Sequence, residues 1–266
     1  MYREYLPGNC LSPYVDKYWE LEGYPEYGMR MNILPDGCTD VIFTLDEAVN
    51  PEKEGLLMQP YRSYFIGPMS TYSELVAYAR RVHMFGIRFR PCGIFRFIEL
   101  PVSELRDQRL EMNEAGMVFD VFFAERLGEE PDVKRRIDFT ERFLLNILRT
   151  TNRSTEGRIM HAVRKINLYG GKLTIRELSG ELCLCQRQLE RQFKWYTGFS
   201  PKEYSCIIKF RNAVRLLRTV DSGDLLSVAM EAGYYDVPHL SREIKRLSGN
   251  TPYSFLSFFP EKSSHL

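Results

Sequence analysis

Two segments near the C-terminus present the side-chain chemistry of DNA recognition on one face of a helix. In residues 186–196, Leu189 and Phe193 recur at helical spacing and predict a buried stripe. At 100° per residue, the opposite face carries Arg187, Glu190, Arg191 and Lys194. Arginine can form bidentate hydrogen bonds to guanine, glutamate can accept from cytosine N4, and lysine can meet phosphates. This face therefore predicts contact with double-stranded DNA.

The same pattern returns 51 residues later. The identical pairs are Leu189 and Leu240, Arg191 and Arg242, Lys194 and Lys245, Gly198 and Gly249, and Pro201 and Pro252. In the second copy Leu240 and Ile244 are predicted to point inward. The second set of candidate DNA contacts is His239, Ser241, Arg242 and Lys245. We also expect Lys209 to meet phosphates.

Each copy has the pattern of a helix-turn-helix unit. Thr174 and Glu177 form a capping box at the start of a short first helix, and a turn near Cys185 leads to the second helix. In the second copy, Asp236 is the predicted N-cap and Pro238 is tolerated in the first turn. A bundle with a solvated charged face is the alternative, but duplication of the whole pattern favours two units that reach successive major-groove segments about 34 Å apart.

Charge and composition divide the chain into two predicted domains. Residues 152–266 carry 18 Lys and Arg against 11 Asp and Glu, whereas residues 1–151 carry 18 against 24. A polar break at 150–155 marks the boundary. The fold class is predicted as α+β: a β-rich N-terminal domain that turns helical from about residue 103, then an all-α C-terminal domain. Residues 40–44 are an expected strand, and residues 138–149 an expected helix.

The C-terminal half resembles the AraC/XylS family of transcriptional regulators over about residues 156–259. The resemblance is carried by LTIRELSGELCLCQRQLERQFKWYTGFSPKEY and VAMEAGYYDVPHLSREIKRLSGNTPYSFL. It implies seven helices forming two helix-turn-helix subdomains, joined by a long helix at about 201–219. Base contacts carry over to Arg187, Glu190, Arg191, Ser241 and Arg242. The chain has Val237-Pro238 where many members have Gln-Ser, so the second helix is expected to read fewer bases or to serve mainly for phosphate contact.

The N-terminal half resembles an uncharacterised domain that precedes the same DNA-binding module in many bacterial regulators. The segments that carry this resemblance are YVDKYWELEG, ILPDGCTDVIF, FIGPM and FGIRFRPCGIFRFIELPVSELRDQ. The resemblance implies a sensor or a dimerisation element and names no ligand.

Ligand-binding candidates in this half are Trp19, Arg88 and Arg90. Arg88 and Arg90 share one face of an alternating segment, where they either hold an anion in a pocket or stay solvated. Trp19 either lines an aromatic pocket or packs in the core. No metal site is expected around Asp36, Cys38 and Asp40, because no histidine is near.

The leading hypothesis is a transcriptional regulator that binds double-stranded DNA and is controlled by a small molecule or by homodimerisation through the N-terminal domain. An activator of this kind would also contact RNA polymerase. The alternative is an N-terminal alkyl-transfer enzyme or redox sensor that uses Cys38 or Cys92. We expect no enzyme activity and no cofactor, because no catalytic triad, phosphate loop or cysteine cluster is recognisable. With no apolar run of about 18 residues and no secretion signal, we expect a cytoplasmic protein without membrane contact.

Overall fold

The structure is a computed structural model of the chain. It describes residues 1–26, 28–45, 58–77, 81–98, 100–112, 119–151, 157–219, 224–253 and 255. Most of the polar break proposed as the domain boundary, residues 152–155, lies outside these ranges.

The N-terminal domain is built on a six-stranded antiparallel sheet in the order β1-β2-β7-β4-β5-β8. Its strands are β1 (Tyr2–Tyr5), β2 (Val15–Gly23), β7 (Val82–Phe89), β4 (Thr39–Thr44), β5 (Ser63–Ile66) and β8 (Arg109–Glu111). Strands β3 (Met29–Ile33) and β6 (Ser73–Ala77) form a separate antiparallel pair. The strand predicted at 40–44 is confirmed as β4.

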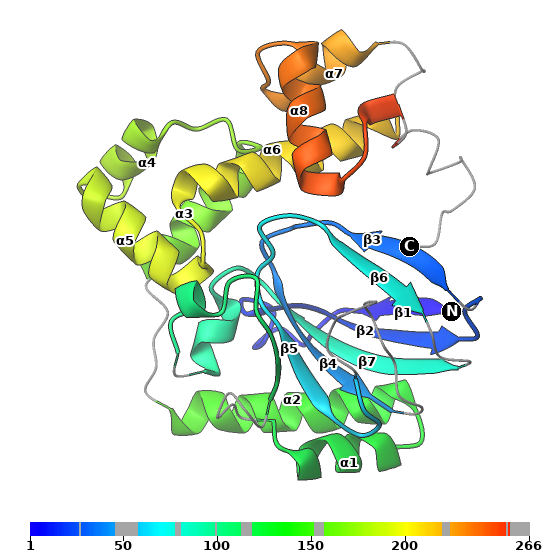
Figure 1. Cartoon of the computed structure of the whole chain (residues 1–266). Coiled ribbons are helices and arrows are strands. Elements are labelled where there is room, and N and C mark those ends of the chain that lie inside the picture. The colour runs from blue at the N-terminus through cyan, green and yellow to red at the C-terminus, as the bar shows by residue number, and fades with distance from the viewer. Residues whose placement is uncertain are drawn as a thin grey trace.

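One face of the six-stranded sheet is covered by α1 (Val121–Glu129) and α2 (Val133–Thr150), as Figure 1 shows. Alternation along β7 buries Phe85, Ile87 and Phe89 in the core between the sheet and these helices. The helix expected at 138–149 lies within α2. Its Leu144 and Ile147 are buried in the same core, so this apolar stripe covers the domain's own sheet.

The expectation of helix from about residue 103 is wrong, because β8 intervenes at Arg109–Glu111 and the first α-helix begins at Val121. Residues 109–111 pair with β5 in the register Arg109 to Ile66. That pairing joins segments more than 40 residues apart in the sequence, so local patterning does not reveal it.

The C-terminal domain is all-helical. Six of its helices lie in the described residues: α3 (Gly157–Leu168), α4 (Ile175–Glu181), α5 (Gln186–Thr197), α6 (Pro201–Leu217), α7 (Leu225–Ala232) and α8 (Val237–Ser248). Beyond α8, positions 252, 253 and 255 are also helical. Helix α6 extends from the first helix-turn-helix unit (α4 and α5) to the second (α7 and α8), which lie at its two ends (Figure 1). It enters both cores, with Tyr204 and Ile207 in the first and Phe210 and Leu217 in the second.

The duplication extends to individual hydrogen bonds at the ends of α5 and α8. The Thr197 hydroxyl donates to the Phe193 carbonyl at 2.7 Å, and the Ser248 hydroxyl donates to Ile244 at 2.6 Å. Each helix then ends at a glycine with positive φ, 82° at Gly198 and 74° at Gly249, which suits the left-handed C-cap. The two units are therefore copies in three dimensions as well as in sequence.

Candidate nucleic-acid interface

Helix α5 separates an apolar face from a charged face. Leu189 and Phe193 are fully buried in the core of the first unit. The residues predicted to contact DNA from this helix are all exposed: Arg187, Glu190, Arg191 and Lys194. The structure thus brings the first predicted set together on one outward stripe.

A tight turn positions the start of α5. Cys183 adopts φ 53°, and the Leu184 amide donates to the Ser179 carbonyl at 3.1 Å. Cys185 is the N-cap, and its amide donates to the Gln188 side chain. Both cysteines are exposed, so neither thiol packs in the core. Their backbone geometry, rather than burial of their thiols, forms the turn.

Helix α8 repeats the arrangement with a stronger cap. The Asp236 carboxylate accepts from the His239 amide at 2.7 Å, while Leu240 and Ile244 are fully buried. Arg242 and Lys245 are exposed and Ser241 is half-buried. Lys245 lies one helical turn beyond the other two residues, on the same outer face. The exposed His239 ring lies edge-on against Tyr234, with centroids 5.3 Å apart.

The outward arginines keep their donors available. Across the part of the chain that the structure describes, Arg187, Arg191 and Arg242 have no hydrogen bond or ion pair to a protein group. Arg246, one position beyond Lys245, instead binds Glu243 at 2.7 Å and is held along its own helix. A free guanidinium on an exposed stripe is suited to bidentate contact with guanine.

Lys209 lies on α6, outside the two recognition helices. Its ammonium donates to the Gly233 carbonyl at 3.3 Å, at the C-terminal end of α7, so it ties α6 to the second unit. This contact gives Lys209 a structural role, and its contact with phosphate stays a prediction. Trp195, which follows Lys194 in the chain, was not among the predicted contacts, yet its aromatic side chain is 48% exposed.

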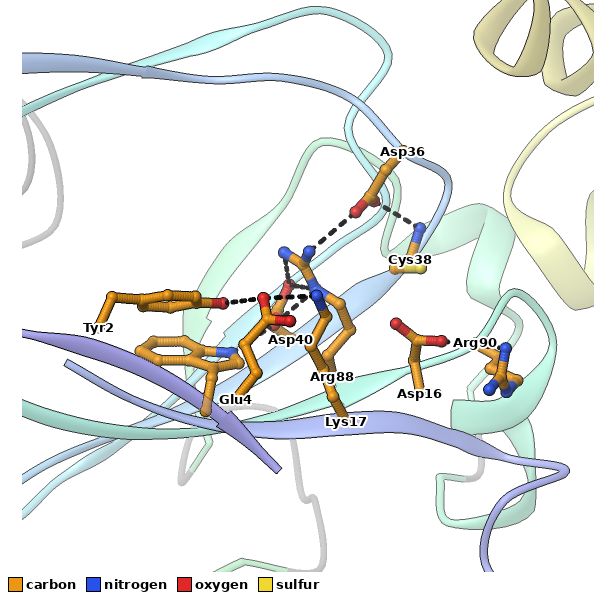
Figure 2. A network of polar contacts seen from close by, with 10 residues as sticks. Tyr2, Glu4, Asp16, Lys17, Asp36, Cys38, Asp40, Arg88 and Arg90 are labelled. Carbon is orange, nitrogen blue, oxygen red and sulfur yellow. Dashed lines mark hydrogen bonds and ion pairs between the residues drawn. The ribbon is translucent and has the colours of Figure 1, made fainter. Parts of the chain in front are cut away.

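The ligand candidate Arg88 is ion-paired inside the N-terminal domain. Its guanidinium lies 3.0 Å from the Asp36 carboxylate and 2.9 Å from Asp40 (Figure 2). Trp19 donates from Nε1 to the same Asp40 at 2.9 Å and is buried. One guanidinium thus faces two carboxylates, so Arg88 is neither a solvated charge nor an unpaired anion receptor.

Arg90 lies apart from Arg88, because β7 ends at Phe89. Its guanidinium donates to the Ser12 carbonyl at 2.9 Å and pairs with Asp16 at 2.9 Å. The structure therefore separates the two arginines that the sequence placed on one face (Figure 2).

Half-buried Cys38 and buried Cys92 both have environments that disfavour a thiolate. Burial raises the pKa of Cys38 well above its ordinary value, and this effect outweighs the opposite influence of Arg88. Burial alone raises the pKa of Cys92 as well. No cluster of metal-ligating side chains occurs among the described residues.

Two clefts lie where the domains meet. One, of about 530 Å³, is lined by residues 34–36 of the N-terminal domain and by Arg211, Asn212 and Arg215 of α6. The other, of about 370 Å³, lies between Thr71 and Arg106 on one side and Glu203 and Arg246 on the other. Both have the size of small-molecule sites.

Comparison with known families divides the chain in the same way. Residues 3–111 match a Domain of unknown function (DUF6597), and residues 178–257 match a Helix-turn-helix domain family. Among curated proteins, the HTH-type transcriptional regulator ArgR of Pseudomonas aeruginosa is 26% identical over 167 residues, which cover 62% of this chain and 47% of ArgR. The chain thus spans about half the length of that relative.

Solved structures of ToxT from Vibrio cholerae are similar in fold. One at 1.65 Å resolution gives a TM-score of 0.51 at 9% identity, covering 91% of this chain and 98% of ToxT. Another, with an unsaturated fatty acid bound, gives a TM-score of 0.48 at 10% identity over 90% of this chain and 94% of ToxT.

Over the described residues, no helix is both long and apolar enough to cross a bilayer.

Proposed function

The C-terminal domain of this chain is an AraC-type helix-turn-helix domain, and on this premise we propose that the chain is a sequence-specific DNA-binding transcriptional regulator. Its two recognition helices, α5 and α8, enter successive segments of the major groove. Arg191 and Arg242 read base edges, while Lys194 and Lys245 bind phosphates. The observation that carries the proposal is the exposure of equivalent arginines on two copies of one unit, each opposite a fully buried leucine.

The N-terminal domain would control DNA binding through contacts with both units. Arg106 pairs with Glu203 of α6, near the first unit. Asn32 donates to the Ser248 carbonyl at 3.2 Å, and the Thr71 hydroxyl donates to the Arg246 carbonyl at 2.8 Å, at the end of α8. A small molecule in either interdomain cleft, or a second copy of the chain, would change the relative placement of the two domains by binding one placement more tightly than another.

A cysteine-dependent alkyl-transfer or redox function of the N-terminal domain has less support. The nucleophile in such chemistry is a thiolate, and burial disfavours that form at Cys38 and Cys92. The regulator is therefore proposed without enzymatic activity. Contact with RNA polymerase and a cytoplasmic location belong to the same proposal.

The test is selection of binding sites by the full chain from randomised duplexes, followed by anisotropy titration of the selected sequence at stated salt concentration. We expect two conserved patches about one helical turn apart, and an affinity at least about 1,000-fold above that for unrelated duplex. Recovery of no enriched sequence, or equal affinity for both duplexes, would reject the proposal.

A further inference from the structure

The two recognition helices differ at the end that leads into the groove. Helix α5 begins with Gln186 and Arg187, whereas the equivalent positions of α8, 51 residues later, hold Val237 and Pro238. Arg187 and Pro238 are both exposed. The arginine at the start of the first helix is thus matched in the second by a residue with neither a side-chain polar atom nor an amide hydrogen.

Pro238 lies on the face that carries the other candidate DNA contacts. It precedes Ser241 by three residues and Arg242 by four, and side chains at these spacings are neighbours on a helix. Leu240, on the opposite face, is fully buried in the core. The exposed ring of Pro238 therefore extends the stripe of Arg242 toward the N-terminus of the helix.

The groups around Pro238 make the exposed surface of the first turn of α8 largely apolar. Val237 is half-buried and packs against the core of the second unit. The Asp236 carboxylate is engaged by the His239 amide, which removes one polar group from the first turn. The His239 ring is the remaining polar side chain of this turn, and it rests edge-on against Tyr234.

The major groove offers one apolar group to such an edge, the C5-methyl of thymine. Residues at the N-terminal end of a recognition helix are those that reach base edges. We propose that Pro238 reads a thymine methyl in the second half-site, at the position equivalent to the base faced by Arg187 in the first. This inference rests on the proposed function and assigns to it a specificity-determining residue.

The expected contribution is small and measurable. Removing a methyl group from a buried apolar contact changes affinity by about fourfold. Loss of a bidentate arginine–guanine contact changes it by about five- to 150-fold. At the start of its helix the second half-site is therefore read by a methyl contact where the first is read by an arginine, and its sequence preference is weaker than that of the first.

The sharpest test changes the DNA and leaves the protein intact. The full chain is titrated by fluorescence anisotropy against its selected duplex, in which each thymine of the second half-site is replaced in turn by deoxyuridine, which lacks only the methyl group. One replacement should weaken binding by about fourfold, and 5-methylcytosine in place of cytosine at that position should bind more tightly than cytosine. Equal affinity for every uracil duplex would overturn the inference while leaving the proposed function intact.

Variants then assign the effect to Pro238. Pro238→Ser should make the same uracil replacement neutral, whereas Pro131→Ser, the same change at an exposed proline of the N-terminal domain, should preserve the wild-type response. Pro238→Arg, which copies Arg187, should shift the selected base from thymine toward guanine. An unchanged uracil effect in Pro238→Ser would overturn the assignment. Absence of any sequence preference in the wild-type chain would reject the proposed function together with this inference.

Discussion

Arg106 of the N-terminal domain lies 2.8 Å from Glu203 on α6 and joins the two domains. The same guanidinium lies over the Phe199 ring, with its central carbon 4.9 Å from the ring centroid. One side chain thus contacts both the segment that ends α5 and the first turn of the linking helix. This places the interdomain contact next to the first recognition helix rather than on a remote surface.

We expect Arg106→Ala to lower the free energy of unfolding by about 1 to 2 kcal/mol, the sum of a partly exposed ion pair and a cation–π contact. Urea denaturation monitored by circular dichroism measures the change. Arg126→Ala is the matched control, because Arg126 also pairs with a glutamate and lies near a phenylalanine ring, but within the N-terminal domain. A change in DNA affinity in Arg106→Ala alone would link this contact to control of binding; a stability equal to wild type would contradict the expectation.

The contact between Arg106 and Glu203 also predicts that part of the free energy of unfolding is lost in acid. Partial burial opposes ionisation of Glu203, but hydrogen bonds from the Ser200 amide and from Arg106 lower its pKa below the ordinary 4.5. A lowered folded-state pKa gives stability that is present above 4.5 and lost as the pH falls through the lowered value. Denaturation midpoints measured from pH 6 down to about pH 3 should fall less steeply in Glu203→Gln than in wild type. Parallel curves would contradict this.

Substitution of Gly37 tests how closely the connection between β3 and β4 packs against the C-terminal domain. It has φ 79°, and a Cβ there would lie 2.4 Å from the Tyr204 ring. Gly28 has a similar φ of 80° with open space around its Cβ position. Gly28→Ala should cost about 1 kcal/mol from backbone strain alone. Gly37→Ala should cost about 1 to 3 kcal/mol more, because the ring must move; equal losses in thermal or urea unfolding would contradict this interface.

Alanine variants of Asp236 and Asp224 distinguish an effect on helix stability from an effect on DNA binding. Each caps a helix of the second unit by accepting an amide hydrogen bond, at 2.7 Å for α8 and 2.9 Å for α7. Alanine at either position should cost about 1 kcal/mol of stability. Only Asp236→Ala should also weaken DNA binding beyond that loss, because its cap fixes the first turn of the recognition helix. Equal effects of both variants in anisotropy titrations would argue against α8 as a reading helix.

Features encoded over short stretches of sequence were predictable. The capping box of Thr174 and Glu177 is present, and the repeat offset of 51 residues is the offset between α5 and α8. Features that depend on strand pairing were not. The face of Arg88 followed from alternation, but its partner Asp40 lies opposite it on β4 only through the register of the sheet. The alternation of residues along a strand predicts the side of the sheet on which a side chain lies. The register between strands determines which residues it contacts there.

The most direct measurement of the central claim is binding of the selected duplex by Arg191→Ala, Arg242→Ala and Lys194→Ala, with Arg164→Ala as an exposed-arginine control on α3. Each of the two arginine variants should lose about 1 to 3 kcal/mol of binding to the selected duplex, with little loss on unrelated duplex. Lys194→Ala should weaken binding to both duplexes alike and reduce the salt dependence by about one phosphate contact. If Arg191→Ala and Arg242→Ala discriminate between the duplexes as well as Arg164→Ala does, the two helices do not read DNA and the account is wrong.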